Sequence, residues 1–221
     1  SPLLACAGVK RGANGDRVRL RDAARRRDPR FLLYSQDSLS LGHLQRNFKI
    51  ASRLVRTTPG ASALLLTSSP HGLDRRAPPG VDFLKIPTLA GTGQEGLEFV
   101  SLRISDAAVT ELRACVIQRA LEVFEPDVFL VDHRPLGVRG ELLPTLEMCR
   151  GMDRPPAVVL GLRDIIGAPD DFRHALPDGV VGDTLEQYYD KVLIYGVGDV
   201  HPLADHCGFS EPLRDLVTYC G

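Results

Sequence analysis

A chain of 221 residues can form one large domain or two small ones, and it is long enough to bury a sizeable core. Hydrophobic residues make up 43% and charged residues 25%, which is ordinary for a globular protein, and a net charge of -1 gives no overall attraction to nucleic acid or to a membrane surface. No apolar run approaches the roughly 20 residues of a membrane-spanning helix. The five cysteines are scattered and include no C-x-x-C pair, which argues against a disulfide framework or a zinc ribbon and fits a reducing cytoplasm.

Residues 1–29 differ in composition from the rest of the chain. Nine of the 27 Lys and Arg residues lie between Lys10 and Arg30, after a short apolar patch. A secretory signal peptide has its charge before its apolar region, which is the reverse order. We therefore predict a solvated basic arm over residues 1–29, with a short helix at 20–27. Contact of the arm with phosphate groups or anionic lipid is the alternative.

The next segment predicts a strand, a loop and a helix. Phe31 to Tyr34 is a short apolar run, and a polar turn follows it. After Gly42, apolar residues recur at three- and four-residue intervals from Leu44 to Val55, which is the spacing of one helix face. In an open α/β sheet the loop of such a unit lies at the carboxyl end of a strand, where ligands bind. The first N–H groups of the helix lack partners inside the helix, so they can bind an anion.

Further strands and helices alternate to the end of the chain. Apolar runs typical of buried strands lie at 61–67, 81–86, 127–131, 157–162 and 191–195, and helices are predicted at 105–124, 141–150 and 183–189. For the helix at 105–124, the pattern predicts one apolar stripe made of Val109, Leu112, Val116, Ala120, Val123 and Phe124. The alternation favours an α/β fold, a Rossmann-like parallel sheet of about six or seven strands with helices on both faces, over residues 30–221.

The segment from Thr88 to Leu102 is rich in glycine. Its residues 91–96 read as G-x-G-x-x-G, but they lead into a polar stretch and no helix begins at the last glycine. We therefore reject a dinucleotide-binding fingerprint and predict a mobile loop over the ligand cleft.

Polar side chains follow three of the predicted strands. Gly42 and His43 come after the first, Asp132 and His133 after the strand at 127–131, and an Arg-Asp pair, Arg163 and Asp164, after the strand at 157–162. Because the carboxyl ends of parallel strands meet at one edge of a sheet, we expect these groups to line a common polar cleft. Helix caps and solvated loop charges are the alternative interpretation of each pair.

The segment 40–46, SLGHLQR, resembles the G-x-G-H-x-x-R loop of certain GT-B glycosyltransferases, with Ser40 in place of the first glycine. Three later blocks, VDHRPLGVRGELLPTLE at 131–147, GLRDII at 161–166 and YYDKVLIYG at 188–196, resemble successive blocks of predicted bacterial glycosyltransferases related to the peptidoglycan N-acetylglucosaminyltransferase. The resemblance covers roughly residues 31–221.

The resemblance implies the amino-terminal, acceptor-side domain of a GT-B enzyme. Such an enzyme has two Rossmann-like domains that face each other across a cleft, and the carboxy-terminal domain binds most of the nucleotide-sugar donor. That second domain is missing after Gly221, so we expect a fragment, with a standalone half as the alternative. The implied reaction is cytoplasmic, inverting and independent of metals and cofactors: a sugar moves from a nucleotide sugar to a hydroxyl acceptor. A nucleotide-sugar hydrolase with the same loop, and a noncatalytic Rossmann-like binding module, are the rival interpretations.

Roles for the polar residues follow from that reaction. The acceptor hydroxyl must lose a proton, and charge develops on the departing diphosphate. His43 suits the base, because an imidazole titrates near neutral pH. Asp132 or Asp164 would orient it or serve as the base instead. The complete prediction is a catalytic pair of His43 and Asp132, with Gly42, Arg46, His133, Arg163 and Asp164 binding substrate.

A metal site is the remaining alternative. His201, Asp205 and His206 offer nitrogen and oxygen ligands, but His201 and Asp205 share a face only if the segment is helical. We predict no metal at this position.

Overall fold

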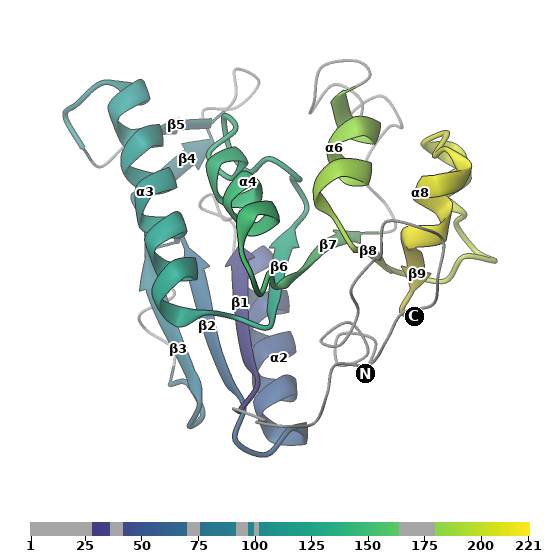
Figure 1. The fold of residues 1–221 in the computed structure, drawn as a ribbon, viewed down its shortest axis with the longest axis horizontal. Helices are drawn as coiled ribbons and strands as arrows, with labels where there is room; N and C mark the ends of the chain where they lie inside the picture. Colours follow the sequence, from purple (N-terminus) through teal and green to yellow (C-terminus); the bar gives the residue numbers. More distant parts are fainter. Residues whose placement is uncertain (1–27, 36–41, 70–75, 92–96, 100–101, 164–179) are drawn as a thin grey trace.

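The structure is a computed structural model, and it describes residues 28–35, 42–69, 76–91, 97–99, 102–163 and 180–221. Its centre is a sheet of seven strands in the order β3-β2-β1-β6-β7-β8-β9 (Figure 1). Every neighbouring pair in this sheet is parallel. The strands are β1 (Arg30–Ser35), β2 (Ser62–Thr67), β3 (Val81–Lys85), β6 (Val128–Asp132), β7 (Ala157–Arg163), β8 (Lys191–Tyr195) and β9 (Val217–Tyr219). The predicted Rossmann-like parallel sheet is confirmed.

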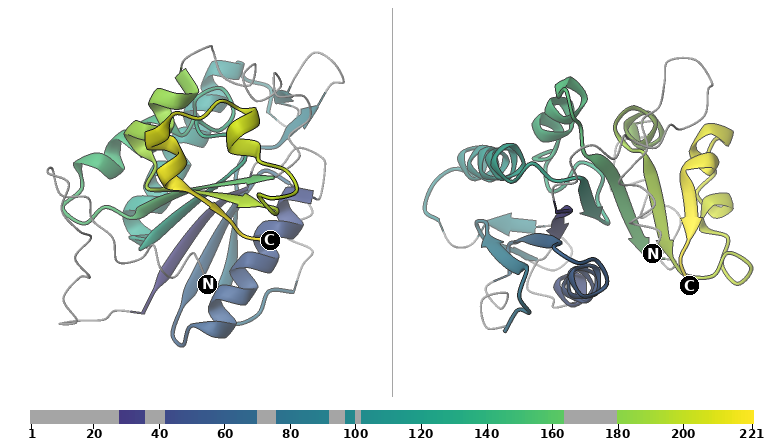
Figure 2. Two further views of the ribbon diagram at one scale, coloured as in Figure 1. Left: turned by 90° about the vertical axis from the view of Figure 1, so that its right-hand side faces the viewer. Right: turned by 60° about the horizontal axis from the view of Figure 1, so that its bottom comes forward.

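Helices cover both faces of the sheet, as predicted (Figure 2). Helix α2 (Gly42–Thr57) packs on one face, against β1, β2 and β3. The opposite face carries α3 (Asp106–Phe124), α4 (Leu143–Gly151), α6 (Val180–Tyr188), α7 (Leu203–His206) and α8 (Glu211–Leu216). Among the residues in the described ranges, no helix is long and apolar enough to cross a membrane.

Two hydrophobic cores result, one on each face of the sheet. Alternate residues of a strand point to opposite faces, so Phe31 and Leu33 pack under α2, whereas Leu32 and Tyr34 pack under α3 and α4. Because both faces are covered, the central strands are apolar throughout rather than alternating. This is why the short apolar runs of the sequence identify the strands well.

Helix α3 begins and ends where its capping residues predict. The Ser105 hydroxyl accepts the N–H of Ala108, and the helix ends at Glu125, whose backbone is left-handed with φ of 45° before Pro126. The predicted apolar stripe is wrong in part. Leu112 is 42% exposed and Val123 is 65% exposed. The buried face of α3 is instead formed by Val109, Arg113, Ile117 and Leu121. The hydrophobic pattern could not predict this face, because Arg113 is buried through its ion pair with Glu141.

The glycine-rich segment is not all loop. Its ends form a two-stranded antiparallel hairpin, β4 (Leu89–Gly91) paired with β5 (Leu97–Phe99). Strands of three residues are too short to show a period of two, so this part of the prediction was wrong. The tip of the segment, residues 92–96, lies outside the described residues. Asp164 also lies outside them, as do residues 1–27 of the predicted basic arm, including its predicted helix.

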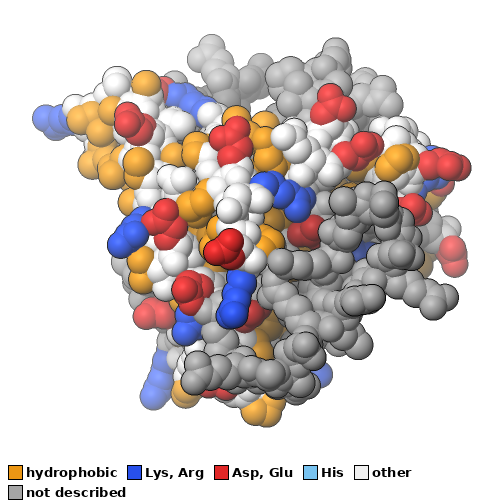
Figure 3. Space-filling view, viewed as in Figure 1, with side chains coloured by type: hydrophobic (Ala, Val, Ile, Leu, Met, Phe, Trp, Pro, Cys, Tyr) orange, Lys and Arg blue, Asp and Glu red, His pale blue; other side chains and the backbone are white. Residues whose placement is uncertain are grey.

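The carboxy-terminal residues complete the sheet. Ser210 caps α8, its hydroxyl accepting the N–H of Leu213, and β9 then pairs in parallel with β8. Helix α4 begins at Leu143, two residues after its predicted start, and has Pro144 in its first turn. On the face covered by α3, α4 and α6, acidic and basic side chains are interspersed rather than gathered by sign (Figure 3).

Candidate functional site

The strand order places a topological switch point between β1 and β6. From β1 the chain proceeds toward β3, whereas from β6 it proceeds toward β9. The helices that follow these two strands, α2 and α4, lie on opposite faces of the sheet. In open α/β sheets, ligands bind beyond the carboxyl ends of the strands at such a point. A ligand site is therefore expected where β1 and β6 end.

Three polar side chains meet at this point. Asp132 is the last residue of β6 and its side chain is fully buried. One carboxylate oxygen, Oδ2, lies 2.6 Å from Nδ1 of His43, and the other, Oδ1, accepts a hydrogen bond of 2.5 Å from Nη2 of Arg46. His43 and Arg46 lie one turn apart at the start of α2, so both reach the same carboxylate. The side chains of His43 and Arg46 keep 14% and 21% of their surface exposed.

This geometry fixes how the imidazole of His43 can act. Two groups lie near Nδ1 of His43: Oδ2 of Asp132 at 2.6 Å and Nη2 of Arg46 at 3.1 Å. The shorter contact is with a carboxylate, which only accepts hydrogen bonds, so we infer that Nδ1 of a neutral His43 carries the hydrogen and donates it to Asp132. The lone pair is then on Nε2. This is the arrangement in which a carboxylate orients a histidine that serves as a general base. The pair can remove a proton from a hydroxyl group or from water.

The start of α2 is itself held in place by a buried polar contact. The amide of Asn47 donates a hydrogen bond of 3.0 Å to the hydroxyl of Ser35, the last residue of β1, and both side chains are buried. The contact ties the first turns of the helix to the end of the strand. The loop between them, residues 36–41, lies outside the described residues.

His133 has an unusual backbone and an unusual environment. Its φ of 69° is in the left-handed region, which few residues other than glycine and asparagine adopt. Its ring centroid lies 5.5 Å from that of His43, and its Nδ1 is buried without a hydrogen-bond partner in the described part of the chain. Burial, reinforced by the neighbouring His43, lowers the pKa of His133 to about 4. His133 is therefore neutral at physiological pH.

The lowered pKa predicts a specific dependence of stability on pH. Between pH 6.5 and about 4 the unfolded chain binds a proton at His133 that the folded protein does not, so the free energy of unfolding falls as the pH falls through this window. Replacing His133 with Asn, which tolerates a left-handed backbone, removes this contribution. Urea unfolding of both proteins should show that wild type loses on the order of 2 kcal/mol more than His133→Asn between about pH 7.5 and pH 5. Parallel pH profiles of the two proteins would contradict a neutral, buried His133.

The remaining predicted residues lie at the same edge with different surroundings. Gly42 begins α2 and is exposed, with open space around it. Arg163 ends β7, is exposed, and lies near enough to His133 to contribute to its lowered pKa. The structure thus brings His43, Asp132, Arg46, His133 and Arg163 to one edge of the sheet. Their roles in catalysis and binding stay predictions.

Two features of the site were not singled out from the sequence. The Tyr195 ring lies against Arg46, whose guanidinium carbon is 5.1 Å from the ring centroid. A Cβ placed on Gly161 would lie 2.1 Å from the Tyr195 hydroxyl, so the ring crosses β7 directly over this glycine. Both residues lie in blocks that carry the family resemblance, Gly161 in GLRDII and Tyr195 in YYDKVLIYG. That resemblance was the only signal in the sequence that could have pointed to them.

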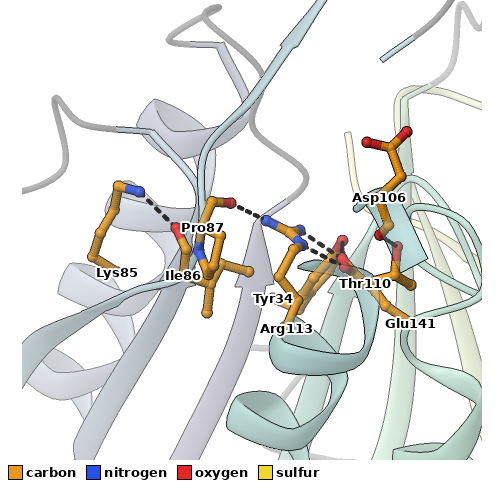
Figure 4. Close-up of polar contacts among 8 residues, drawn as sticks. All are labelled: Tyr34, Lys85, Ile86, Pro87, Asp106, Thr110, Arg113 and Glu141. Atoms are coloured by element: carbon orange, nitrogen blue, oxygen red, sulfur yellow. Dashed lines mark hydrogen bonds and ion pairs between the residues drawn. The ribbon is translucent and has the colours of Figure 1, made fainter. Parts of the chain in front are cut away.

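A second polar cluster lies at the carboxyl edge on the opposite face (Figure 4). The side chains of Arg113 and Glu141 keep 1% and 0% of their surface exposed, and they form a bidentate pair at 2.5 and 2.6 Å. The Tyr34 hydroxyl donates to the same carboxylate at 2.5 Å, and Arg113 donates to the carbonyl of Pro87 at 2.5 Å. Burial raises the pKa of Tyr34 well above its ordinary value. This cluster joins β1, α3, the segment before α4 and the segment after β3.

The candidate metal ligands do not assemble. The rings of His201 and His206 meet edge to face with centroids 4.7 Å apart, and Asp205 forms an ion pair with Arg214. Throughout the described ranges, no three His, Cys, Asp or Glu side chains are grouped so that they could hold a metal ion.

Comparison with known proteins bears on the fold. Comparison with models of protein families and with curated protein sequences gives no match. A solved glycosyltransferase from Rickettsia africae ESF-5 superimposes with a TM-score of 0.51 over 87% of this chain, at 9% sequence identity. The chain has a glycosyltransferase-like fold. It spans 42% of the length of that glycosyltransferase. TubZ of Clostridium botulinum phage c-st, a protein truncated in its C-terminal tail, superimposes over 75% of the chain and 51% of its own length at 16% identity, with a TM-score of only 0.39.

Proposed function

We propose that this chain is the acceptor-side half of a glycosyltransferase of GT-B architecture, related to the peptidoglycan N-acetylglucosaminyltransferase. It would help transfer a sugar from a nucleotide sugar to a hydroxyl acceptor, with a second Rossmann-like domain supplying most of the donor site. The observation that carries the proposal is the contact of 2.6 Å between His43 Nδ1 and the buried carboxylate of Asp132 at the switch point of the sheet. The glycosyltransferase-like fold supports it.

In this proposal His43 is the general base. With its Nδ1 hydrogen on Asp132, Nε2 takes the proton of the acceptor hydroxyl while the hydroxyl oxygen attacks the anomeric carbon of the donor. The bond from that carbon to the diphosphate breaks, and the diphosphate leaves with the electron pair. Asp132 stabilises the imidazolium that forms. The reaction requires no metal and no cofactor.

Charge on the diphosphate is met by other groups at the same edge. The exposed start of α2 at Gly42 offers N–H groups that have no partner within the helix itself, and the positive end of the helix dipole. Arg163 is an exposed cation at the end of β7. Arg46 is less suited to this task than the sequence suggested, because its guanidinium already binds Asp132. We assign Arg46 to the support of the His43–Asp132 pair, and Arg163 to the binding of the diphosphate.

Hydrolysis of a nucleotide sugar is the second candidate, since the same histidine and carboxylate would deprotonate water as readily as a sugar hydroxyl. In either reaction the nucleotide sugar is a substrate of the cytoplasm. The cysteines at 115, 149, 207 and 220 are free thiols in the structure, in keeping with that reducing compartment.

An assay of the longest natural form of the protein separates the candidates. The protein is incubated with a panel of nucleotide sugars, with and without hydroxyl acceptors, and products are followed by mass spectrometry. Release of nucleotide that requires an acceptor supports transfer, and release in its absence supports hydrolysis. Asp132→Asn keeps the size of the side chain but removes the charge that orients His43, so turnover should fall by about 10²–10⁴. If the protein binds a nucleotide sugar but turns over none of the panel, both enzymatic candidates fail and the noncatalytic binding module is supported.

A further inference from the structure

The Arg46 side chain is 21% exposed, and its guanidinium is only partly hydrogen-bonded. Its Nη2 donates to Asp132 Oδ1 at 2.5 Å and lies 3.1 Å from His43 Nδ1, but its Nε is buried and has no hydrogen-bond partner in the described ranges. A partly buried cation needs compensation for the water that it loses. The face of the Tyr195 ring, 5.1 Å from the guanidinium carbon, provides it, because an aromatic face attracts a cation within about 6 Å.

It is the ring of Tyr195, rather than its hydroxyl, that makes this contact. The hydroxyl oxygen is buried and forms no hydrogen bond within the part of the chain that the structure describes. Burial is the main cause that raises the pKa of Tyr195, so the hydroxyl stays protonated and carries no charge to the guanidinium. A phenylalanine at this position would present the same face to Arg46.

Gly161 makes room for that ring. A Cβ at this position would lie 2.1 Å from the Tyr195 hydroxyl oxygen and 2.8 Å from Cζ, so no residue with a side chain fits unless the ring moves. The ring lies between β7 and Arg46, because Tyr195 pairs with Arg163 in the sheet and its side chain extends back over Gly161. The glycine is thus the base of a stack that continues through Tyr195 and Arg46 to Asp132.

We propose that Tyr195 and Gly161 are positioning residues for the catalytic pair. They hold Arg46 on one oxygen of Asp132, and this leaves the other oxygen aimed at Nδ1 of His43. The stack thereby fixes His43 in the tautomer whose Nε2 is free to accept a proton. Its consequence for turnover rests on the proposed function, whereas the tautomer itself can be observed without any substrate.

The test is nitrogen NMR of the 221-residue chain with ¹⁵N-labelled histidine, recorded at about pH 8.5, where an ordinary imidazole is neutral. The His43 signals are assigned by their loss in His43→Gln. Wild type should show a protonated Nδ1 and an unprotonated Nε2. In Tyr195→Leu and in Gly161→Ala this pattern should be lost, with the hydrogen shared between the nitrogens or moved to Nε2. Tyr195→Phe should retain the wild-type pattern.

Matched controls guard against a general effect of substitution. Gly151→Ala also adds a methyl group to a glycine of ordinary backbone, but with nothing within 4 Å, and should leave the His43 signals unchanged. Tyr195→Leu introduces no clash, so it tests the inference even if Gly161→Ala fails to fold, as judged by circular dichroism.

The outcomes separate the inference from the function on which it rests. A wild-type pattern in folded Tyr195→Leu would overturn the positioning role and leave the His43–Asp132 pair intact, whether or not Gly161→Ala folds. Loss of the pattern in Tyr195→Phe would also overturn it, because the hydroxyl would then be the group that matters. A wild type that lacks the protonated Nδ1 would contradict the catalytic pair itself, and the inference with it.

Discussion

Replacing His43 with alanine in the longest natural form of the protein is expected to lower turnover in the proposed reaction by about 10²–10⁴, or roughly 3–5 kcal/mol of activation free energy. In that proposal the imidazole takes the proton of the acceptor, and its Nδ1 lies 2.6 Å from the Asp132 carboxylate. The His43 side chain lies in the first turn of α2 and is only 14% exposed. Some loss of melting temperature should accompany the loss of turnover.

His43→Gln is the matched control. It keeps size and polarity but cannot act as a base near neutral pH, so its turnover should stay as low as that of His43→Ala, while its melting temperature should be closer to wild type. Both quantities are measured on the same two variants. Turnover of His43→Ala within about threefold of wild type would remove the histidine from the mechanism. Asp132 would then be the candidate base.

Replacing Arg113 with leucine is expected to destabilise the fold by about 3–5 kcal/mol, because it leaves the buried carboxylate of Glu141 without its ionic partner. That is a large fraction of the roughly 5–15 kcal/mol that separates folded from unfolded domains. The measurement is the free energy of unfolding in urea. Arg119→Leu is the control on the same helix: its side chain is 75% exposed and pairs with Glu122, so the change should stay within about 0.5 kcal/mol.

The double variant Arg113→Leu with Glu141→Leu distinguishes a buried pair from simple packing. Removing both charges abolishes the uncompensated carboxylate, and such replacements are often neutral or stabilising. We therefore expect the double variant to recover most of the stability that the single variant loses. A double variant as unstable as Arg113→Leu would show that the loss comes from the aliphatic part of the arginine or from its bond to the Pro87 carbonyl.

The sequence alone determined the sheet and the edge of it that carries the candidate site. Strands buried on both faces are apolar runs, and helices packed on a sheet repeat their apolar residues every three or four positions, so short windows of sequence contain both signals. His43 and Asp132 were predicted as partners because each follows a strand, and parallel strands end at one edge. The hairpin β4–β5 was missed, since three-residue strands are too short to carry a pattern.

Only the tertiary structure decided what these side chains do to one another. Arg46 and Asp132 are 86 residues apart, and Arg113 and Glu141 are 28 apart. No local pattern shows that a helix arginine will be buried against a distant carboxylate, or that a tyrosine will cross a glycine of the next strand to reach an arginine. Periodicity depends on neighbours along the chain, whereas the burial of a charge is stabilised by partners brought together through space. For this reason the sequence could indicate which residues share an edge of the sheet, and only the fold decided how their charges are paired.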